Sequence, residues 1–254
     1  MGTKISVVIP THNRLRLLRA CLASLEKQTA PPDSFEVVVS VDGSPDGTID
    51  FLKAYRPPFN LRYFDQANRG AASARNTGIR NAASNLILCL DDDIIASPQL
   101  IEEHLRSHEA CPDSLVQGAL LVHDSVSQTP FLRYEKNRYE TFKRAMEKPP
   151  GKIAGDDVSS GNISLRKSLL TELGGFNETL DLKALNNDDG ELALRLERRH
   201  VPLVYNGRAL GFMAHVKSLE EQWSQSYLYG KTHVYLQKEF PEASWKLSPW
   251  VQDK

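Results

Sequence analysis

Three consecutive aspartates, Asp91, Asp92 and Asp93, are the residues of this sequence best suited to chemistry. They directly follow the apolar run LILCL at residues 86–90, which is typical of a buried strand. Adjacent carboxylates repel one another, and a divalent cation offsets that charge most simply. Oxygen ligands suit Mg²⁺ or Mn²⁺, which usually retain water and bridge to substrate phosphates. A water-exposed acidic turn is the alternative, and the preceding buried strand makes it less favoured.

Two further segments carry polar groups that can bind a ligand. Asp42 follows the run VVVSV and precedes Gly43, so its carboxylate can accept hydrogen bonds from a ribose or a base edge. An ordinary Asx-type turn is the more frequent use of such a sequence.

Arg75 follows small residues at positions 70–74 that allow close approach of a backbone or ligand, and its guanidinium can offset a diphosphate or carboxylate charge. Tight helix–sheet packing with Arg75 in a structural ion pair explains this segment equally well.

Acidic residues also open the segment DDGELALRLERR, which begins at residue 188. A helix dipole favours acids in the first turn by about 0.3–1 kcal/mol, which accounts for part of this cluster. The functional alternative is a general base, Asp188 or Asp189, that removes a proton from a hydroxyl. His215 stands alone after a short apolar run, where a structural role is the more frequent one, although a neutral imidazole can complete a metal site.

Alternating strands and helices are predicted to bring these groups together. In sheets of this type the strands are parallel and ligands bind beyond their carboxyl ends. Thr11, Asp42 and Asp91 each follow or end a strand, so they are expected at one edge of the sheet. Pro and Gly in residues 149–157 predict a mobile loop. Hydrophobic periodicity predicts strands at 4–9, 35–41, 61–64, 86–90 and 115–122, and helices at 14–28, 47–54, 69–83, 98–110, 130–147, 188–199 and 218–238.

The composition excludes several classes of protein. The chain has 254 residues, a formal net charge of −1, 41% apolar residues and 25% charged residues, as in ordinary globular proteins. Near-neutral charge argues against a dedicated nucleic-acid-binding protein. No run of eighteen apolar residues occurs, so no transmembrane segment is expected. Three sparse cysteines favour a reduced, cytoplasmic protein. Rossmann dinucleotide, P-loop and nucleophile-elbow motifs do not occur.

Taken in order, the motifs resemble those of glycosyltransferase family 2, inverting enzymes with the GT-A fold. The resemblance implies an α/β, single Rossmann-like domain with a mostly parallel, mixed central sheet flanked by helices, plus a C-terminal helical segment. The expected GT-A domain covers 1–215, with a nucleotide-binding half at 1–95, an acceptor-binding half at 96–215 and a helical extension at 216–254. The motifs are SVVIPTHNR (6–14), VDGSPDGT (41–48), NRGAASARNTGI (68–79), LDDD (90–93), SSGNISLRKS (159–168), GGFNETL (174–180) and DDGELALRL (188–196).

The resemblance also implies roles for individual residues. LDDD resembles the DXD motif, so Asp93 and Asp91 are expected to hold Mn²⁺ or Mg²⁺, and His215 matches a late metal-ligating histidine of some GT-A enzymes. Asp189 matches the catalytic base, with Asp188 beside it. Gly161 and Asn162 are expected beside the sugar or the acceptor. A nucleotide-diphosphate sugar, most often a UDP-sugar in this family, is expected to contact Pro10, Thr11, Asn13, Arg14, Asp42, Asn68, Arg75, Asp91 and Asp92.

The implied reaction is one in-line displacement, in which Asp189 removes the acceptor proton and the metal stabilises the departing diphosphate. Processive relatives carry a Gln-x-x-Arg-Trp signature followed by membrane spans. Here the corresponding helix contains Gln222-Trp223-Ser224-Gln225, so transfer of one sugar per encounter is expected, in glycan or cell-surface polysaccharide biosynthesis. A glycan, lipid-linked sugar, peptide or small molecule can be the acceptor.

Two alternative functions remain open. A sugar-nucleotide pyrophosphorylase would need a glycine-rich loop after the first strand, and PTHNR at residues 10–14 has no glycine. A non-catalytic nucleotide-sugar-binding module would not need the full set of acidic residues, Asp91 to Asp93 with Asp188 and Asp189.

The tail at 216–254 contains all three tryptophans. Packing of this tail on the core is the favoured interpretation. The alternatives are a homodimer formed through its helix and peripheral contact with the inner membrane face. The lack of a basic amphipathic face weakens the membrane alternative.

Overall fold

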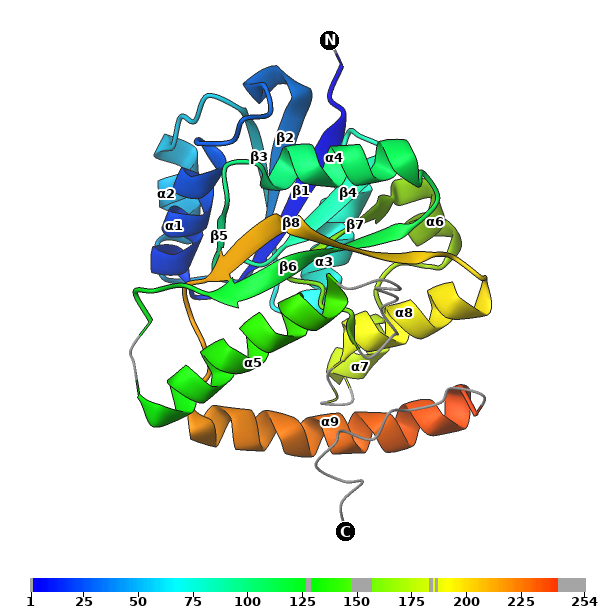
Figure 1. Ribbon diagram of the computed structural model, residues 1–254. Coiled ribbons are helices and arrows are strands. Elements are labelled where there is room, and N and C mark those ends of the chain that lie inside the picture. The colour runs from blue at the N-terminus through cyan, green and yellow to red at the C-terminus, as the bar shows by residue number, and fades with distance from the viewer. Residues whose placement is uncertain (1, 127–128, 148–156, 183–184, 186, 242–254) are drawn as a thin grey trace.

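An eight-stranded sheet forms the centre of the molecule, and helices cover both of its faces (Figure 1). The structure is a computed structural model that describes residues 2–126, 129–147, 157–182, 185 and 187–241. The strands are β1 (Ile5–Thr11), β2 (Phe35–Asp42), β3 (Asn60–Gln66), β4 (Leu86–Leu90), β5 (Ile94–Ala96), β6 (Leu115–Val122), β7 (Asn162–Arg166) and β8 (Leu203–Met213). They follow the order β3-β2-β1-β4-β7-β6-β8-β5. Parallel pairing joins β3, β2, β1 and β4, and also β6 and β8, whereas β7 and β5 run antiparallel to their neighbours.

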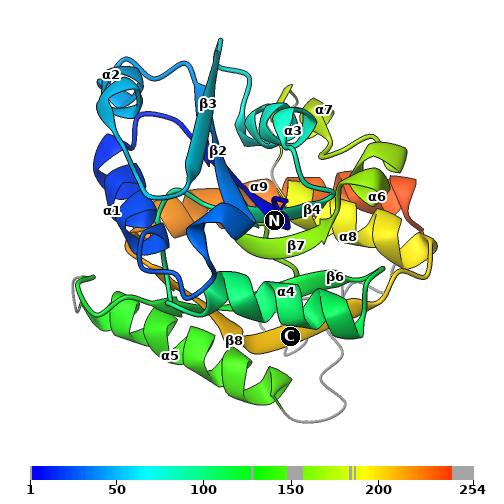
Figure 2. The same ribbon diagram turned by 90° about the horizontal axis from the view of Figure 1, so that it is seen from above.

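The helices form one layer on each side of the sheet (Figure 2). Side chains alternate along a strand, so Val7 and Ile9 of β1 join one apolar cluster and Val8 joins the other. The first cluster includes α1, α2 and α4, and the second includes α3, α6 and α8. The helices are α1 (Leu15–Leu25), α2 (Thr48–Ala54), α3 (Ala71–Asn81), α4 (Leu100–Ala110), α5 (Pro130–Met146), α6 (Lys167–Glu172), α7 (Glu178–Leu182), α8 (Asp188–Arg198) and α9 (Leu219–Glu239).

The alternating first half of the chain agrees with the sequence prediction except for the short strand β5, whereas the second half differs in more elements. Strands β5, β7 and β8 and helices α6 and α7 were not predicted. In β7 the sequence NISLR places the polar side chains of Asn162 and Ser164 inside the protein, where both form hydrogen bonds with His104 of α4. The face of the strand toward α4 is therefore polar, and hydrophobic periodicity does not reveal the strand. The predicted loop at 149–157 lies outside the described residues except for Asp157.

Helix α9 crosses the lower side of the molecule beneath α5, α7 and α8 (Figure 1). It begins at a capping box, in which the Ser218 hydroxyl accepts a hydrogen bond from the Glu221 amide and the Glu221 carboxylate accepts one from the Ser218 amide. Its far end is anchored on α8, where Leu236 and Phe240 form an apolar cluster with Leu194. Among the described residues, no helix combines the length and apolarity that crossing a bilayer requires.

Candidate active site

The acidic triplet follows β4 and meets the end of β1, which pairs with β4 in parallel. Nη1 of Arg14 donates to Asp92 Oδ1 and Asp93 Oδ2, at 3.0 Å each. The Thr11 hydroxyl donates to the other Asp92 oxygen at 2.7 Å. Side chains of Thr11, Asp92 and Pro10 are all buried. Thr11 and Asp92 are thus bonded to each other inside the site, and contact of these three residues with the nucleotide sugar stays a prediction.

Arg75 joins the triplet to the first turn of α8. Its Nη2 donates to Asp91 Oδ1 at 2.8 Å, and its Nη1 donates to Asp188 Oδ2 at 2.9 Å. The guanidinium is buried and lies 5.4 Å from the ring centroid of Phe176. In the described part of the chain its Nε has no hydrogen-bond partner. The structure thus gives Arg75 a two-sided ion pair, which was one of the two interpretations left open, and brings Asp91 and Asp188 to opposite sides of one guanidinium.

Asp189 lies beside this ion pair at the start of α8. Its Oδ2 accepts a hydrogen bond from the Ser160 amide at 3.1 Å, and its Oδ1 accepts one from the Gly190 amide at 3.0 Å. Burial, together with the charge of Asp188, raises the pKa of Asp189 to about 6, although the two amides and Arg75 act in the opposite direction. A carboxyl with this pKa is ionised at neutral pH and is a stronger base than an ordinary aspartate.

Asp91 and Asp93 have the chemistry of ligands for a divalent cation. Burial and the neighbouring Asp91 raise the pKa of Asp93 to about 7 against the opposing charge of Arg14, so the triplet is short of positive charge. The Asp91 side chain is 35% exposed. A Cβ on Gly161 would come within 3.0 Å of Asp91 Oδ2, so glycine keeps this side of the carboxylate open.

The protein alone does not form a closed metal cage in its described part, since no three His, Cys, Asp or Glu side chains gather for one there. Mn²⁺ and Mg²⁺ are commonly held by one or two carboxylates, with substrate phosphates and water completing the shell. Asp91 and Asp93 fit that coordination pattern. His215 adjoins them, because the preceding Ala214 amide donates to the Asp93 carbonyl at 2.8 Å. Burial and then the charge of Arg14 lower the pKa of His215, which favours a neutral imidazole.

A chain of polar residues that was not predicted runs from the end of β8 into α9. Lys217 Nζ donates to Gln225 Oε1 at 2.5 Å, and Gln225 Nε2 donates to the Tyr229 hydroxyl at 3.0 Å. Burial and Arg14 lower the pKa of Lys217, while Asp93 and Asp91 oppose this change. Burial and the charges of Asp189 and Asp188 raise the pKa of Tyr229. The capping signature SLEE and the four-residue spacing of Gln225 and Tyr229 were the available signals.

The predicted nucleoside side of the site lies at the ends of β1 and β2. Asp42 is buried, and its carboxylate accepts hydrogen bonds from Gln66 Nε2 at 2.8 Å and from the amides of Arg69 and Gly70 at 3.0 and 2.9 Å. These bonds fix the loop before α3, and contact of Asp42 with a ribose or base stays a prediction. Asn13 and Asn68 are exposed beside it.

Exposed His12 also belongs to this nucleoside side, and the sequence analysis did not single it out. Its Nε2 lies 3.0 Å from Asn13 Nδ2 and 3.2 Å from Asn68 Nδ2. Gly43 is required here, because its φ is +69° and an added Cβ would approach the Asn68 amide to 2.9 Å. His12, Asn13 and Asn68 therefore present exposed polar groups where the two strands end.

Asn162 is predicted to lie beside the sugar or the acceptor, and the structure places its side chain inside the sheet. Its side chain is fully buried and donates to the carbonyls of Ala119 and Ala209 at 3.1 and 2.9 Å. His104 Nε2 lies 2.9 Å from its Oδ1. The amide is thus used to join three strands of the sheet. Gly161, one residue earlier, does lie against Asp91.

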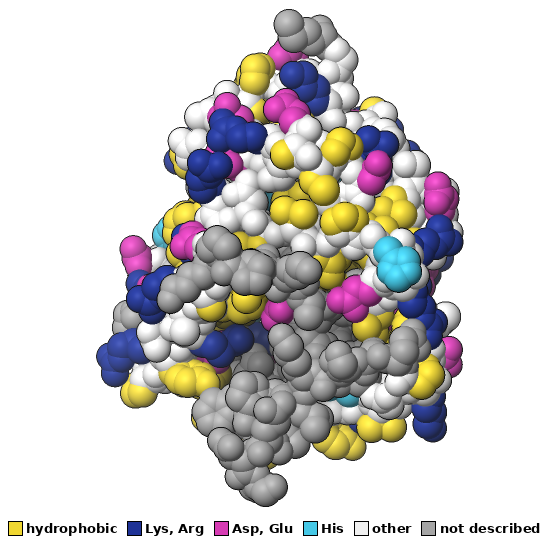
Figure 3. Space-filling view, turned by 45° about the vertical axis from the view of Figure 1, so that its right-hand side comes forward, with side chains coloured by type: hydrophobic (Ala, Val, Ile, Leu, Met, Phe, Trp, Pro, Cys, Tyr) yellow, Lys and Arg dark blue, Asp and Glu magenta, His cyan; other side chains and the backbone are white. Residues whose placement is uncertain are grey.

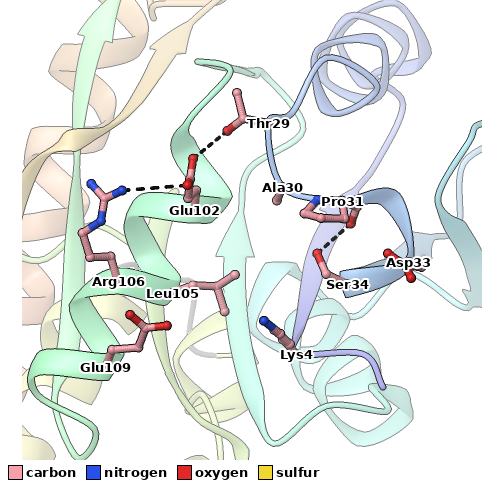
Figure 4. A pocket seen from close by; sticks show the side chains of 10 residues that line it. All are labelled: Lys4, Thr29, Ala30, Pro31, Asp33, Ser34, Glu102, Leu105, Arg106 and Glu109. Carbon is pink, nitrogen blue, oxygen red and sulfur yellow. Dashed lines mark hydrogen bonds and ion pairs between the residues drawn. The ribbon is translucent and has the colours of Figure 1, made fainter. Parts of the chain in front are cut away.

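Two surface hollows lie away from these residues. One, of about 310 Å³, lies between α4 and the segments that precede β1 and β2, where Thr29 and Arg106 both reach Glu102 (Figure 4). The other, of about 410 Å³, is lined by residues 52–63. On the face drawn in Figure 3, acidic, basic and apolar side chains are interspersed. The acidic edge of the sheet therefore remains the candidate site on chemical grounds.

One edge of the mixed sheet gathers the acidic triplet, Arg14, Arg75 and the Asp189 carboxylate, whose pKa is raised, and this arrangement agrees with the GT-A type of glycosyltransferase. The profile described as "Glycosyl transferase family 2" matches residues 6–174, and the chain belongs to this family. Validoxylamine A glucosyltransferase of Streptomyces hygroscopicus subsp. limoneus is 33% identical over an alignment of 234 positions that covers 83% of this chain and 51% of that protein. The chain thus spans about half the length of this relative.

Solved structures share the fold at low sequence identity. The mannosyltransferase PcManGT from Pyrobaculum calidifontis, in complex with GDP-Man and Mn²⁺, has a TM-score of 0.65 and 21% identity, over 88% of this chain and 60% of that one. S. aureus TarS 1-349 in complex with UDP has a TM-score of 0.67 and 19% identity, over 85% of this chain and 61% of that one. The likeness confirms the GT-A type of α/β fold.

Proposed function

We propose that this glycosyltransferase moves one sugar, with inversion, from a nucleotide-diphosphate sugar to a hydroxyl acceptor, and that it uses Mn²⁺ or Mg²⁺. The bridge from Asp91 through Arg75 to Asp188 carries this proposal, because it sets the metal candidates beside the base candidate, Asp189. The complexes of PcManGT with GDP-Man and Mn²⁺ and of TarS with UDP support a nucleotide-sugar donor and a divalent ion. A UDP-sugar is our first choice.

The proposed reaction uses groups from both sides of Arg75. Asp189 accepts the proton of the acceptor hydroxyl while the hydroxyl oxygen forms a bond to the anomeric carbon. The bond from that carbon to the diphosphate oxygen breaks, and the electron pair leaves with the nucleoside diphosphate. Asp91 and Asp93 would hold the divalent ion, with His215 as a further ligand, and the bound ion would supply Lewis-acid stabilisation of the diphosphate. Lys217 adds positive charge near the same carboxylates.

A panel of nucleotide sugars tests the activity itself. We expect one of them, with Mn²⁺, to raise the melting temperature of the protein and to be hydrolysed slowly to nucleoside diphosphate and free sugar. A pyrophosphorylase would instead form a nucleotide sugar from a nucleoside triphosphate and a sugar 1-phosphate. A non-catalytic module would show the thermal shift without hydrolysis or transfer. Either of these two results would contradict the proposal.

The rate should depend on pH through Asp189. The pKa of its carboxyl is raised to about 6, and the base must be ionised, so kcat should rise with pH and reach half its plateau near pH 6. Below that value, each pH unit should cost about tenfold in kcat. The measurement is kcat between about pH 4.5 and 8 at saturating donor, acceptor and Mn²⁺. A kcat that stays constant down to pH 5 would exclude Asp189 as the base.

Asp93→Ala should weaken the metal-dependent binding of nucleotide. Calorimetric titration of the wild type is expected to give weak Mn²⁺ binding alone and much tighter binding with UDP, because substrate phosphates complete the coordination shell. The variant should bind UDP with Mn²⁺ at least about tenfold more weakly, which corresponds to about 1.4 kcal/mol. Asp124→Ala, on an exposed aspartate paired with Lys136, is the matched control. Equal affinities of Asp93→Ala and the control would remove Asp93 from the metal site.

A further inference from the structure

The outward face of α9 carries a continuous apolar stripe, which we define as Leu219, Trp223, Tyr227, Gly230 and Val234. Apart from Gly230, which has no side chain, the residues of the stripe are exposed, and Trp223 and Tyr227 are 78% and 69% exposed. At about 100° per residue, the five positions fall within an arc of about 80° and span roughly 22 Å of helix. A single exposed apolar residue needs no explanation, whereas a continuous stripe of this length marks an interaction surface.

The fold itself does not use this stripe. The side of α9 that packs on the body is the opposite one, where Thr232 and Leu236 are buried. Gly230 is informative because glycine inside a helix costs about 1 kcal/mol relative to alanine. A Cβ at Gly230 would meet no atom within 4 Å, so nothing in the described part of the chain requires glycine there. A surface that packs closely on the stripe would require it.

The charges around the stripe favour a protein partner over a membrane. None of its five residues is charged, and Glu220, Lys231 and Lys238 lie on one flank of it. The whole helix carries three glutamates and two lysines. A helix that binds an anionic membrane surface has Lys and Arg along its polar face, and α9 lacks this excess.

We propose that the stripe binds the same stripe of a second copy of this chain, with the two α9 helices antiparallel about a two-fold axis between positions 228 and 229. In this register Trp223 packs on the partner's Val234, and Tyr227 packs over the partner's Gly230. Each large side chain thus meets a smaller one, which is the complementarity that an isologous interface needs. The absence of a side chain at Gly230 then has a purpose, since it admits the tyrosine ring.

The flanking charges select the antiparallel orientation. In this orientation the same flanks of the two helices face each other, and Glu220 comes beside the partner's Lys238, once on each side of the axis. In a parallel pair the Glu220 flank would instead face the partner's opposite flank, where Gln222 and Ser226 lie and no lysine offsets the carboxylate. Pairing of opposite charges at the rim therefore favours the antiparallel orientation.

Sedimentation velocity of the full chain over a concentration series tests the proposal. We expect a reversible dimer that Trp223→Glu converts to a monomer with unchanged circular dichroism. Gly230→Ala should weaken the dimer at least tenfold while the melting temperature of the monomer stays constant or rises, because alanine favours the helix. Glu220→Lys should also weaken the dimer, and adding Lys238→Glu should restore it.

Three results would overturn the proposal. One is a wild-type chain that stays monomeric at every soluble concentration. Another is a dimer that Trp223→Glu and Gly230→Ala leave unchanged, since the interface would then lie elsewhere. The third is a monomer that binds vesicles of neutral or anionic lipid through Trp223, which would identify the stripe as a membrane contact. None of these results depends on the proposed donor or metal.

Discussion

Asp189→Asn is expected to lower kcat about 10²- to 10⁴-fold while the affinity for donor and Mn²⁺ changes little. Asparagine has the same shape, and its carbonyl oxygen can keep a hydrogen bond from the Ser160 or Gly190 amide, but it does not take up a proton. Steady-state kinetics and calorimetry with UDP measure the two quantities separately. An equal loss of donor affinity would contradict the role of Asp189 as a base.

The same variant should not be less stable than the wild type, which separates lost chemistry from lost folding. The pKa of Asp189 is about 6 in the folded protein, above the ordinary value of 3.8, so the folded state binds this proton more tightly than the unfolded state. Its contribution to stability is therefore fully present below pH 3.8 and decreases as the pH rises to 6. At neutral pH, Asp189→Asn removes an ionised carboxyl that burial disfavours, so its melting temperature should equal or exceed that of the wild type. Asp188→Asn is the neighbouring control, and it should lower the melting temperature because it breaks the ion pair with Arg75.

The edge of the sheet that holds the site could be predicted from local sequence. Thr11, Asp42 and Asp91 lie at or just after the ends of apolar strands, and parallel strands direct their carboxyl ends to one side. Local sequence did not predict which hydrogen-bond partner each of these side chains has. Asp42 bonds backbone amides and Thr11 bonds Asp92, and both choices depend on loops that dock only in the folded protein.

The second half of the chain resisted prediction because its contacts are polar and distant in sequence. In β7, Asn162 and Ser164 are buried against His104, about sixty residues away, so an internal strand has polar residues where periodicity expects apolar ones. Arg75 and Asp188 are 113 residues apart. The charge of Asp189 acts on the pKa of Tyr229 only because α9 folds back under α8. Such pairs depend on tertiary docking, and an isolated motif does not contain that information.

Arg75→Met is expected to have the largest effect on stability, because it leaves Asp91 and Asp188 without their shared cation. Removing one partner of a buried ion pair costs about 3–5 kcal/mol, and the partial exposure of Asp91 puts this case toward the lower end. Urea unfolding at neutral pH measures the loss. Arg75→Lys keeps the charge and cannot span both carboxylates in the same way, so an intermediate loss is expected.

A double variant shows whether the loss arises from the bridge itself. In the double variant Arg75→Met/Asp188→Asn, only the more exposed Asp91 is left unpaired. The stability losses of the two single variants should therefore sum to much more than the stability loss of the double variant. The remaining activity of Arg75→Met gives an independent readout, because the Arg75 charge lowers the pKa of Asp189. Without that charge, the acid limb of the kcat profile should move to higher pH. Additive losses, or a total below about 1 kcal/mol as for a surface pair, would mean that Arg75 does not link the two halves of the site.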